Sequence, residues 1–191
     1  MTETQSSLQH TANVLGALSL AVADRMNTSV EAVAALGPSA PAALAAMHQF
    51  LDGASVTQLS SVLGLTHSGT VRLVDRLVNE GLVERGGAQD GRAVSVALTR
   101  RGREMAAQIL QTREMSLTSA LSALSADEID NLASALDTML TTVTLARAEQ
   151  RTSQSSGRPQ PWLCRLCDFA ACGRSEGDCP VNNVATTSNR C

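Results

Sequence analysis

The sequence predicts a mainly α-helical protein that contains one small β hairpin and ends in a short cysteine-rich segment. Apolar residues recur with helical period over most of the first 148 residues, and the period changes to two over residues 82–98. All five cysteines lie after residue 163. The chain of 191 residues is 43% hydrophobic but only 2% aromatic, so its core must consist largely of Ala, Leu and Val. A chain of this length buries enough surface to fold without disulfides.

Composition and charge argue against several classes of protein. The formal net charge is −3, so the chain as a whole does not attract nucleic acid by charge alone. No apolar run approaches the roughly 20 residues of a membrane span, and the first residues do not resemble a secretory signal. We therefore expect a cytoplasmic protein with no membrane partner. We also expect no enzyme, because the sequence has no phosphate loop, nucleotide fingerprint, paired-carboxylate motif or Ser-His-Asp order.

The two ends of the helical part are expected to form dimerisation helices. Residues 1–38 and residues 103–148 each carry a narrow apolar stripe of helical or near-heptad period. The stripes consist of Leu8, Leu15, Leu18, Val22 and Met26, and of Ile129, Leu132, Leu136, Leu140 and Val143. Each stripe is too narrow for a fully buried helix and suits packing against a partner, either a second copy of the chain or the other stripe.

Residues 39–102 are expected to form a compact DNA-binding domain. A capping box from Ser55 to Gln58 begins a short helix, and Gly64 ends it. After a tight turn Thr66 caps a second helix. A strand, a glycine-rich tip and a return strand follow, and the return strand carries Val94, Val96 and Leu98. This order of elements is that of a winged helix-turn-helix, in which an α+β wing is added to an α-helical pair.

The outward face of the second helix and the tip of the hairpin carry the candidate DNA contacts. They are His67, Ser68, Thr70, Arg72 and Arg76 on the helix, and Asp90 and Arg92 on the hairpin. An Arg can fork onto guanine or clamp a phosphate, and hydroxyls near a helix amino terminus can donate to phosphate. Arg92 suits the minor groove, with Asp90 holding its guanidinium. Taken singly these are ordinary solvated side chains, and only their order within one module favours DNA binding.

The stretch from residue 55 to residue 102 resembles the DNA-binding core of the MarR family of bacterial transcription regulators. The resemblance rests on Leu-Val-Asp-Arg-Leu at 73–77, Gly-Leu-Val-Glu-Arg at 81–85 and Asp-Gly-Arg at 90–92. It implies a homodimer with intertwined terminal helices that binds a pseudo-palindromic operator on double-stranded DNA. It also implies repression of neighbouring genes and release by a small-molecule or oxidant effector. By position, the candidate contacts match the family's recognition helix and wing.

Residues 162–191, which follow a linker at 149–161, are expected to bind one metal centre. Cys164, Cys167, Cys172 and Cys179 follow the pattern C-x2-C-x4-C-x6-C. Four thiols this close favour a closed four-cysteine site under reducing conditions. The spacing resembles both the structural zinc lobe of alcohol dehydrogenases and the iron–sulfur loop of a MerR-type redox regulator. Of the possible interpretations of the four cysteines, a zinc site is favoured, an iron–sulfur cluster is the close alternative, and free redox thiols come third. Cys191 is expected not to be a ligand.

Four apolar residues around these cysteines are expected to pack the segment against the rest of the protein or a partner chain. They are Trp162, Leu163, Leu166 and Phe169. We thus expect a dimeric transcription repressor whose four-cysteine site stabilises it or senses redox state. The alternative is a redox or metal-carrying protein that uses its winged helix for protein interactions. Salt-dependent binding of specific DNA would favour the regulator, and indifference to DNA would favour the carrier.

Overall fold

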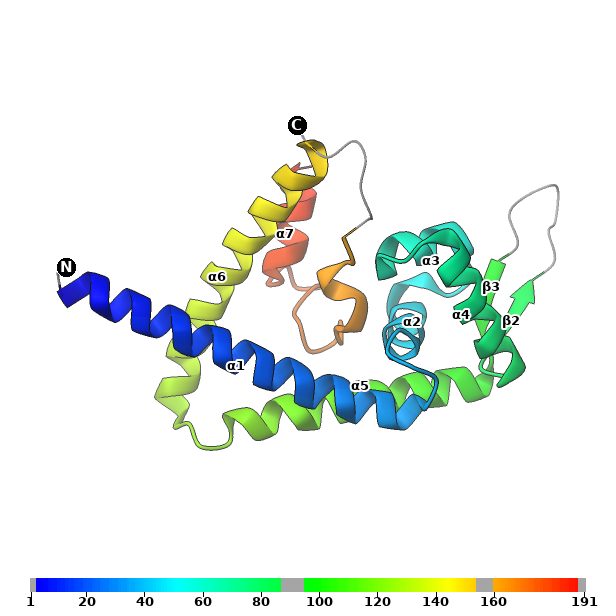
Figure 1. Ribbon diagram of the computed structural model, residues 1–191, viewed down its shortest axis with the longest axis horizontal. Coiled ribbons are helices and arrows are strands. Elements are labelled where there is room, and N and C mark those ends of the chain that lie inside the picture. Colours follow the sequence, from blue (N-terminus) through cyan, green and yellow to red (C-terminus); the bar gives the residue numbers. More distant parts are fainter. Residues whose placement is uncertain (1–2, 87–94, 154–159, 189–191) are drawn as a thin grey trace.

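The structure, a computed structural model, describes residues 3–86, 95–153 and 160–188. Two long helices, α1 (Glu3–Ala34) and α5 (Arg100–Leu121), run side by side along the molecule. A winged module lies at one end of this pair, and α6 (Ala126–Ser153) rises from the other end (Figure 1). The carboxyl-terminal segment lies between α6 and the winged module, so the end of the chain returns to its first half.

The winged module combines short helices with a small antiparallel sheet. Its helical segments are α2 (Ala40–Ala46), the π-helical turn η1 (Met47–Leu51), α3 (Val56–Leu63) and α4 (His67–Asn79). Its strands are β1 (Ala54–Ser55), β2 (Val83–Gly86) and β3 (Ser95–Leu98), in the order β1-β3-β2. The mainly α-helical fold with a winged helix-turn-helix is therefore confirmed.

Local capping begins both helices of the helix-turn-helix as the sequence predicts. The hydroxyl of Ser55 accepts a hydrogen bond from the backbone N–H of Gln58 at 3.2 Å, and the Gln58 side chain accepts one from the Ser55 backbone at 2.9 Å. Gly64 ends α3 with a φ of 64°, a left-handed conformation that glycine adopts at little cost. Thr66 then caps α4 by accepting a hydrogen bond from the backbone N–H of Gly69 at 3.1 Å.

A third strand is the main addition to the predicted wing. Strand β1 pairs with β3, so that Ala54 lies opposite Val96. The side chain of Asp52 fixes this approach, because it accepts a hydrogen bond from the Leu98 backbone N–H at 2.8 Å and pairs with Arg103 of α5 at 3.2 Å. Asp52 thereby links the wing to α5. Its contact with Leu98 spans 46 residues of sequence, and its contact with Arg103 spans 51. Such contacts leave no periodic signal in a sequence.

Several element boundaries differ from the sequence-based prediction. The expected helix after Pro41 changes to the π-helical turn at Met47, and the expected return-strand residue Val94 lies outside the described residues. Helix α6 continues past residue 148 into the expected linker. A final helix, α7 (Pro180–Ser188), occupies a stretch that carries only weak helical signals and is stabilised by packing along α6.

The hydrophobic core joins the winged module to the adjoining parts of α1 and α5. Its largest fully buried side chains include Leu44, Met47, Leu59, Leu73, Leu77, Leu82, Leu98 and Ile109. Small residues in α2 are completely buried, which allows neighbouring helices to approach closely. Among the described residues no aromatic side chain belongs to this buried core, as the composition predicts. The core therefore holds α3 and α4 as one rigid pair.

Candidate nucleic-acid interface and cysteine segment

Helix α4 turns one face to the core and the opposite face to solvent. Its inward side chains are buried: Leu73, Val74 and Leu77. Four of the candidate DNA contacts are exposed: His67, Ser68, Arg72 and Arg76. Residues 68, 72 and 76 are four apart, so a hydroxyl and two guanidinium groups follow one line along the helix. This exposed line near a helix amino terminus has the chemistry of a phosphate- and base-contacting surface.

Thr70 departs from the sequence-based prediction of a DNA contact. Its side chain is 0% exposed, and its hydroxyl donates a hydrogen bond to the backbone carbonyl of Thr66 at 3.0 Å. Because residue 70 is one turn before Val74 and three residues before Leu73, it falls on the inward face of α4. Thr70 therefore contributes to packing and to the start of the helix, and its side chain is not placed to reach DNA.

The base of the wing is described, whereas its tip is not. Asp90 and Arg92, the two candidate contacts at the tip, lie outside the described residues. At the base, Arg85 of β2 pairs with Asp75 of α4 at 2.6 Å, and both side chains are about half exposed. An exposed ion pair adds little stability, but this one fixes the direction in which the wing leaves the recognition helix. The sequence analysis missed the pair, although both residues belong to the motifs that resemble the MarR family.

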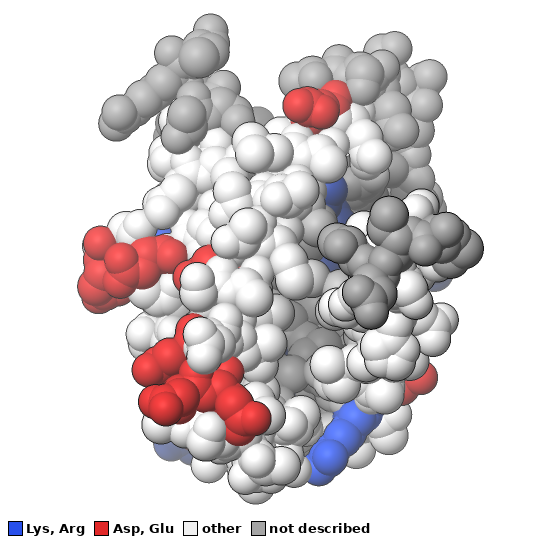
Figure 2. All heavy atoms as spheres, turned by 90° about the vertical axis from the view of Figure 1, so that its left-hand side faces the viewer, with Lys and Arg blue, Asp and Glu red and all other residues white. Residues whose placement is uncertain are grey.

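The apolar stripes on the terminal helices remain largely uncovered. Helix α1 packs along α5, and α6 packs along α7, so the two stripes do not cover each other. The exposed large apolar residues on these helices include Leu8, Leu15, Leu18, Ile129, Leu136, Leu140 and Val143. Figure 2, viewed from the end that carries the amino end of α1, shows a surface that is mostly uncharged, with acidic side chains gathered toward one side. An exposed apolar surface of this extent is typical of an interaction site.

The four cysteines of the carboxyl-terminal segment differ in burial and in hydrogen bonding. The segment begins with the short 3-10 helix η2 (Leu163–Leu166). Cys164 and Cys179 are buried, and Cys167 and Cys172 are partly exposed. The thiol of Cys167 donates to the Leu163 carbonyl at 3.9 Å, and that of Cys172 donates to the Phe169 carbonyl at 3.8 Å. The backbone N–H of Cys167 donates to the Cys164 carbonyl at 3.1 Å, which closes the turn between these two cysteines.

The cysteines of the C-x2-C pair differ in acidity. The neighbouring Cys164 thiol is the main cause that lowers the pKa of Cys167, and Arg113 and Arg165 act in the same direction. The pKa of Cys164 is raised by the same neighbour and by burial. Burial is also the main cause that raises the pKa of Cys172. Of these three thiols Cys167 is therefore the one that loses its proton most readily, which favours its use as a metal ligand.

The described residues do not include a ready-made metal cage. No three Cys, His, Asp or Glu side chains within the described ranges are arranged closely enough to hold a metal ion. A single tetrahedral site would therefore require the four sulfurs to come closer together. The loop between Cys172 and Cys179 has the left-handed turn residues Gly173 and Gly177, with φ values of 64° and 88°, so it follows a tight path suited to wrapping around an ion.

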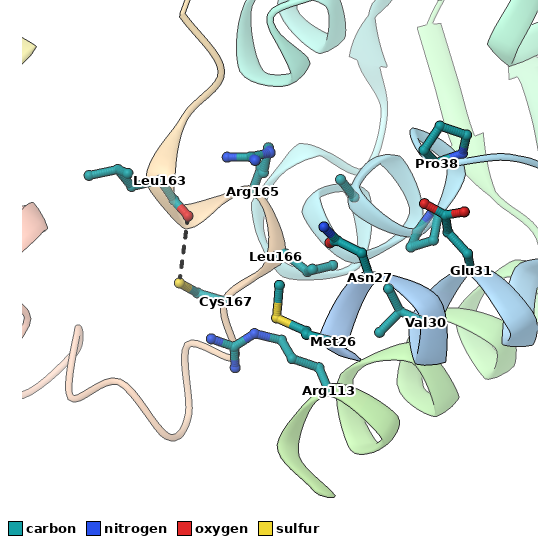
Figure 3. Close-up of a pocket in the computed structure, with 12 residues that line it drawn as sticks. Met26, Asn27, Val30, Glu31, Pro38, Arg113, Leu163, Arg165, Leu166 and Cys167 are labelled. Carbon is teal, nitrogen blue, oxygen red and sulfur yellow. Dashed lines mark hydrogen bonds between the residues drawn. The ribbon is translucent and has the colours of Figure 1, made fainter. Parts of the chain in front are cut away.

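A cavity of about 170 Å³ lies where the cysteine segment meets α1 and α5. Figure 3 shows Met26 and Asn27 of α1, Arg113 of α5 and Cys167 lining it, with a dashed line from the Cys167 sulfur to the Leu163 carbonyl. That contact is 3.9 Å long. The Cys167 thiol therefore donates to the Leu163 carbonyl at the wall of a small cavity that the Arg113 side chain also lines.

The apolar residues around the cysteines hold the segment against the chain's own winged module. Leu166 packs against the buried core, and Leu163 lines the cavity. Trp162 and Phe169 each stack on Phe50 of η1. The expectation that these four residues pack the segment is confirmed, and the partner is the same chain.

The fold and the exposed face of α4 together define the class of domain. A capped helix pair, an exposed arginine-bearing second helix and a three-stranded wing are the parts of a winged helix DNA-binding domain. No helix in the described part of the chain is long and apolar enough to cross a membrane.

Comparison with known families gives the more particular assignment. Residues 36–93 match the sequence model described as the MarR family. This match covers less than half of the chain, and over these residues the winged helix module is similar to that of the MarR family. A comparison with curated proteins finds no match.

Solved structures show the same fold at low sequence identity. A MarR family protein from Bacillus stearothermophilus has a TM-score of 0.63 at 22% identity, over 75% of this chain and 99% of its own. YusO from Bacillus subtilis has a TM-score of 0.61 at 22% identity, over 78% of this chain and 99% of its own. MepR, a transcription regulator of the Staphylococcus aureus multidrug efflux pump MepA, has a TM-score of 0.61 at 16% identity, over 69% of this chain and 97% of its own. These proteins are matched over nearly their whole length, whereas a substantial part of this chain is left over.

Proposed function

We propose that the protein is a homodimeric transcription repressor that binds a pseudo-palindromic operator in double-stranded DNA. The observation that carries the proposal is the exposed face of α4, where Arg72 and Arg76 stand on a helix that the core and the Thr66 cap hold rigidly. Arg72 and Arg76 would contact bases or phosphates, while His67 and Ser68 would contact the backbone near the helix amino terminus. Asp90 and Arg92 remain proposed contacts of the wing.

Homodimerisation is supported by the uncovered apolar stripes of α1 and α6. Leu8 is 70% exposed, and α6 leaves Leu136 and Val143 nearly half exposed. Covering these residues with a second copy would remove apolar surface from water and would place two α4 helices on one operator. A two-fold dimer requires the two half-sites of the DNA to be inverted repeats, which is why we propose a pseudo-palindrome.

We propose further that Cys164, Cys167, Cys172 and Cys179 hold one metal centre, either zinc or an iron–sulfur cluster. Four thiols between residues 164 and 179 supply the four soft ligands that both centres require. Four thiolates leave such a centre with a net negative charge, and Arg113 and Arg165 line the same cavity as Cys167, so positive groups stand near one of the proposed ligands. The centre would stabilise the regulator or sense redox state, and an oxidant or a small molecule would act as effector.

The experiment that tests the function is selection of DNA by the purified full-length chain. Genomic fragments that bind at fixed salt are sequenced, and the affinity of the best site is measured for the wild type and for Arg72→Ala and Arg76→Ala. Loss of a base-contacting arginine is expected to cost about 1–3 kcal/mol of binding free energy while the fold stays intact. Arg100→Ala is the matched control, because Arg100 lies on α5, its side chain is 92% exposed, and it pairs with Glu104 of the same helix.

The outcomes separate the two classes of function. A specific site, weakened by both α4 variants and unchanged by the control, supports a DNA-binding regulator. A wild-type chain that selects no sequence, or that binds all DNA alike, contradicts the proposal and favours a redox or metal carrier.

A further inference from the structure

All aromatic residues of the chain meet at one place. The sequence contains one Trp, two Phe and no Tyr. The ring of Phe50 is stacked on that of Trp162, with centroids 6.0 Å apart and planes 9° apart, and on that of Phe169, with centroids 5.2 Å apart and planes 6° apart. The guanidinium carbon of Arg174 lies 4.8 Å from the centre of the Phe169 ring. A chain that uses no aromatic residue in its described core therefore uses every one of them to join its cysteine segment to its winged module.

Two long-range hydrogen bonds fix the segment on either side of this stack. The backbone N–H of Trp162 donates to the carbonyl of Val62 in α3 at 2.8 Å. The backbone N–H of Phe169 donates to the Gln49 side chain of η1 at 3.1 Å. The segment is thus bound in a defined register and does not merely rest on an apolar surface.

The other side of the cysteine segment is attached to α6. Arg147 of α6 donates a hydrogen bond to the carbonyl of Pro161 at 2.6 Å, and α7 packs along α6. Figure 1 shows the segment in the space between α6 and the winged module. The cysteine segment is therefore a strut that links α6, through Arg147 and Pro161, to α3, through Val62 and Trp162.

The strut acts on the recognition helix through the helix that supports it. Val62 is itself buried in α3, the helix that packs directly against α4. Since α3 and α4 move as one packed pair, the place at which the strut holds α3 sets the direction of α4 relative to α6. In a dimer built on the terminal helices, that direction determines the distance between the two recognition helices.

We propose that the cysteine segment is a built-in brace, which, docked through Phe50, holds the two recognition helices of the dimer at the spacing of the operator half-sites. This inference rests on the proposed DNA-binding dimer. A braced dimer has less conformational freedom to lose on binding, so it binds two half-sites more tightly than an unbraced one. The predicted ligands lie close to the ring residues in sequence: Cys164 is two residues after Trp162, and Cys167 is two residues before Phe169. A change at these cysteines would therefore also act on the docking of the two rings.

The test compares Phe50→Ala with His48→Ala in the full-length protein. Both residues lie in η1, but His48 is exposed and Phe50 carries the stack. Trp162, the single tryptophan, reports docking by its fluorescence. Binding is measured for the selected operator with both half-sites and for a DNA with only one.

For Phe50→Ala we expect a red-shifted Trp162 emission, a loss of about tenfold or more in operator affinity, and little change on the single half-site. His48→Ala is expected to behave as the wild type in all three measurements. Gln49→Ala, which removes only the acceptor of the Phe169 N–H, provides a milder variant with the same direction of change.

Three results would overturn the brace. They are a red-shifted emission with unchanged operator affinity, an equal loss on both DNAs, and an unchanged emission in Phe50→Ala. The failure of the proposed function is a different result, since then the wild-type chain selects no operator at all. If Phe50→Ala does not fold, the comparison of Gln49→Ala with His48→Ala decides by the same criteria.

Discussion

Gly102 lies in the first turn of α5, where this helix approaches Leu82 and Leu98 so closely that there is no space for a side chain. A Cβ at this position would overlap the carbonyl oxygen of Leu82 and crowd the Leu98 side chain. The Leu82 carbonyl already accepts the Thr99 backbone N–H at 3.0 Å, so it is not free to move. We expect Gly102→Ala to lower the free energy of unfolding by about 1–3 kcal/mol, as overpacked core sites do.

The matched control for this prediction is Gly16→Ala in the middle of α1. A Cβ at Gly16 meets nothing within 4 Å, so this change is expected to leave stability unchanged or raise it by about 0.5–1 kcal/mol through helix propensity. Urea denaturation of the two variants and the wild type measures both effects. If Gly102→Ala is as stable as the wild type, the close approach of α5 to Leu82 is wrong.

At the scale of the element, the start of α6 illustrates how local chemistry sets a helix boundary. The Glu128 carboxylate accepts hydrogen bonds from the Ser125 backbone at 2.9 Å and from the Ser125 hydroxyl at 2.8 Å. The backbone N–H of Glu128 in turn donates to that hydroxyl at 3.4 Å, which completes a capping box. These hydrogen bonds from Ser125 hold the pKa of Glu128 below its ordinary value.

This lowered pKa gives a pH dependence of known sign. The folded protein binds the Glu128 proton less readily than the unfolded chain does, so the contribution is present at neutral pH and is lost as the pH falls through the folded pKa. Glu128→Gln is therefore expected to melt slightly below the wild type at neutral pH, with a difference that disappears in acid. Asp130→Asn, outside the capping box, is the control. A difference in melting temperature that stays constant with pH would contradict the assignment.

At the scale of the whole molecule, the proposed metal centre makes the four cysteines act as a unit. A closed four-thiolate site loses its geometry when one ligand is removed. We expect Cys164→Ser, Cys167→Ser, Cys172→Ser and Cys179→Ser each to abolish or sharply weaken metal binding, whereas Cys191→Ser keeps it. Metal content per chain, measured after anaerobic purification, together with the absorbance spectrum, also distinguishes zinc from an iron–sulfur cluster.

The result that contradicts a single four-cysteine centre is equally direct. Full metal content in any of the first four variants, or its loss in Cys191→Ser, breaks the assignment. Because the centre would fix Trp162 and Phe169 around Phe50, loss of metal is also expected to shift the Trp162 emission as Phe50→Ala does. An emission that does not respond to metal removal would separate the centre from the brace.

Features of this protein that depend on near neighbours could be predicted from the amino-acid sequence. The capping box at Ser55, the Thr66 cap and the end of α3 at Gly64 are all present as predicted. Each requires contacts within about four residues, so residue types at fixed spacing suffice to specify it. The order of these signals was enough to predict the winged helix fold and the exposed arginine face of α4.

Features that depend on residues far apart in the chain became visible only in the folded molecule. The tertiary structure turned Thr70 inward, although its place in the predicted recognition helix suggested an outward role. It added β1 to the sheet, and it brought the cysteine segment onto Phe50 and Val62, which lie far earlier in the chain. Apolar residues at Trp162 and Phe169 predicted that the segment packs somewhere, but hydrophobic burial is non-directional and names no partner. Phe50 is the packing partner because of how the whole chain folds, and a local sequence pattern does not contain that information.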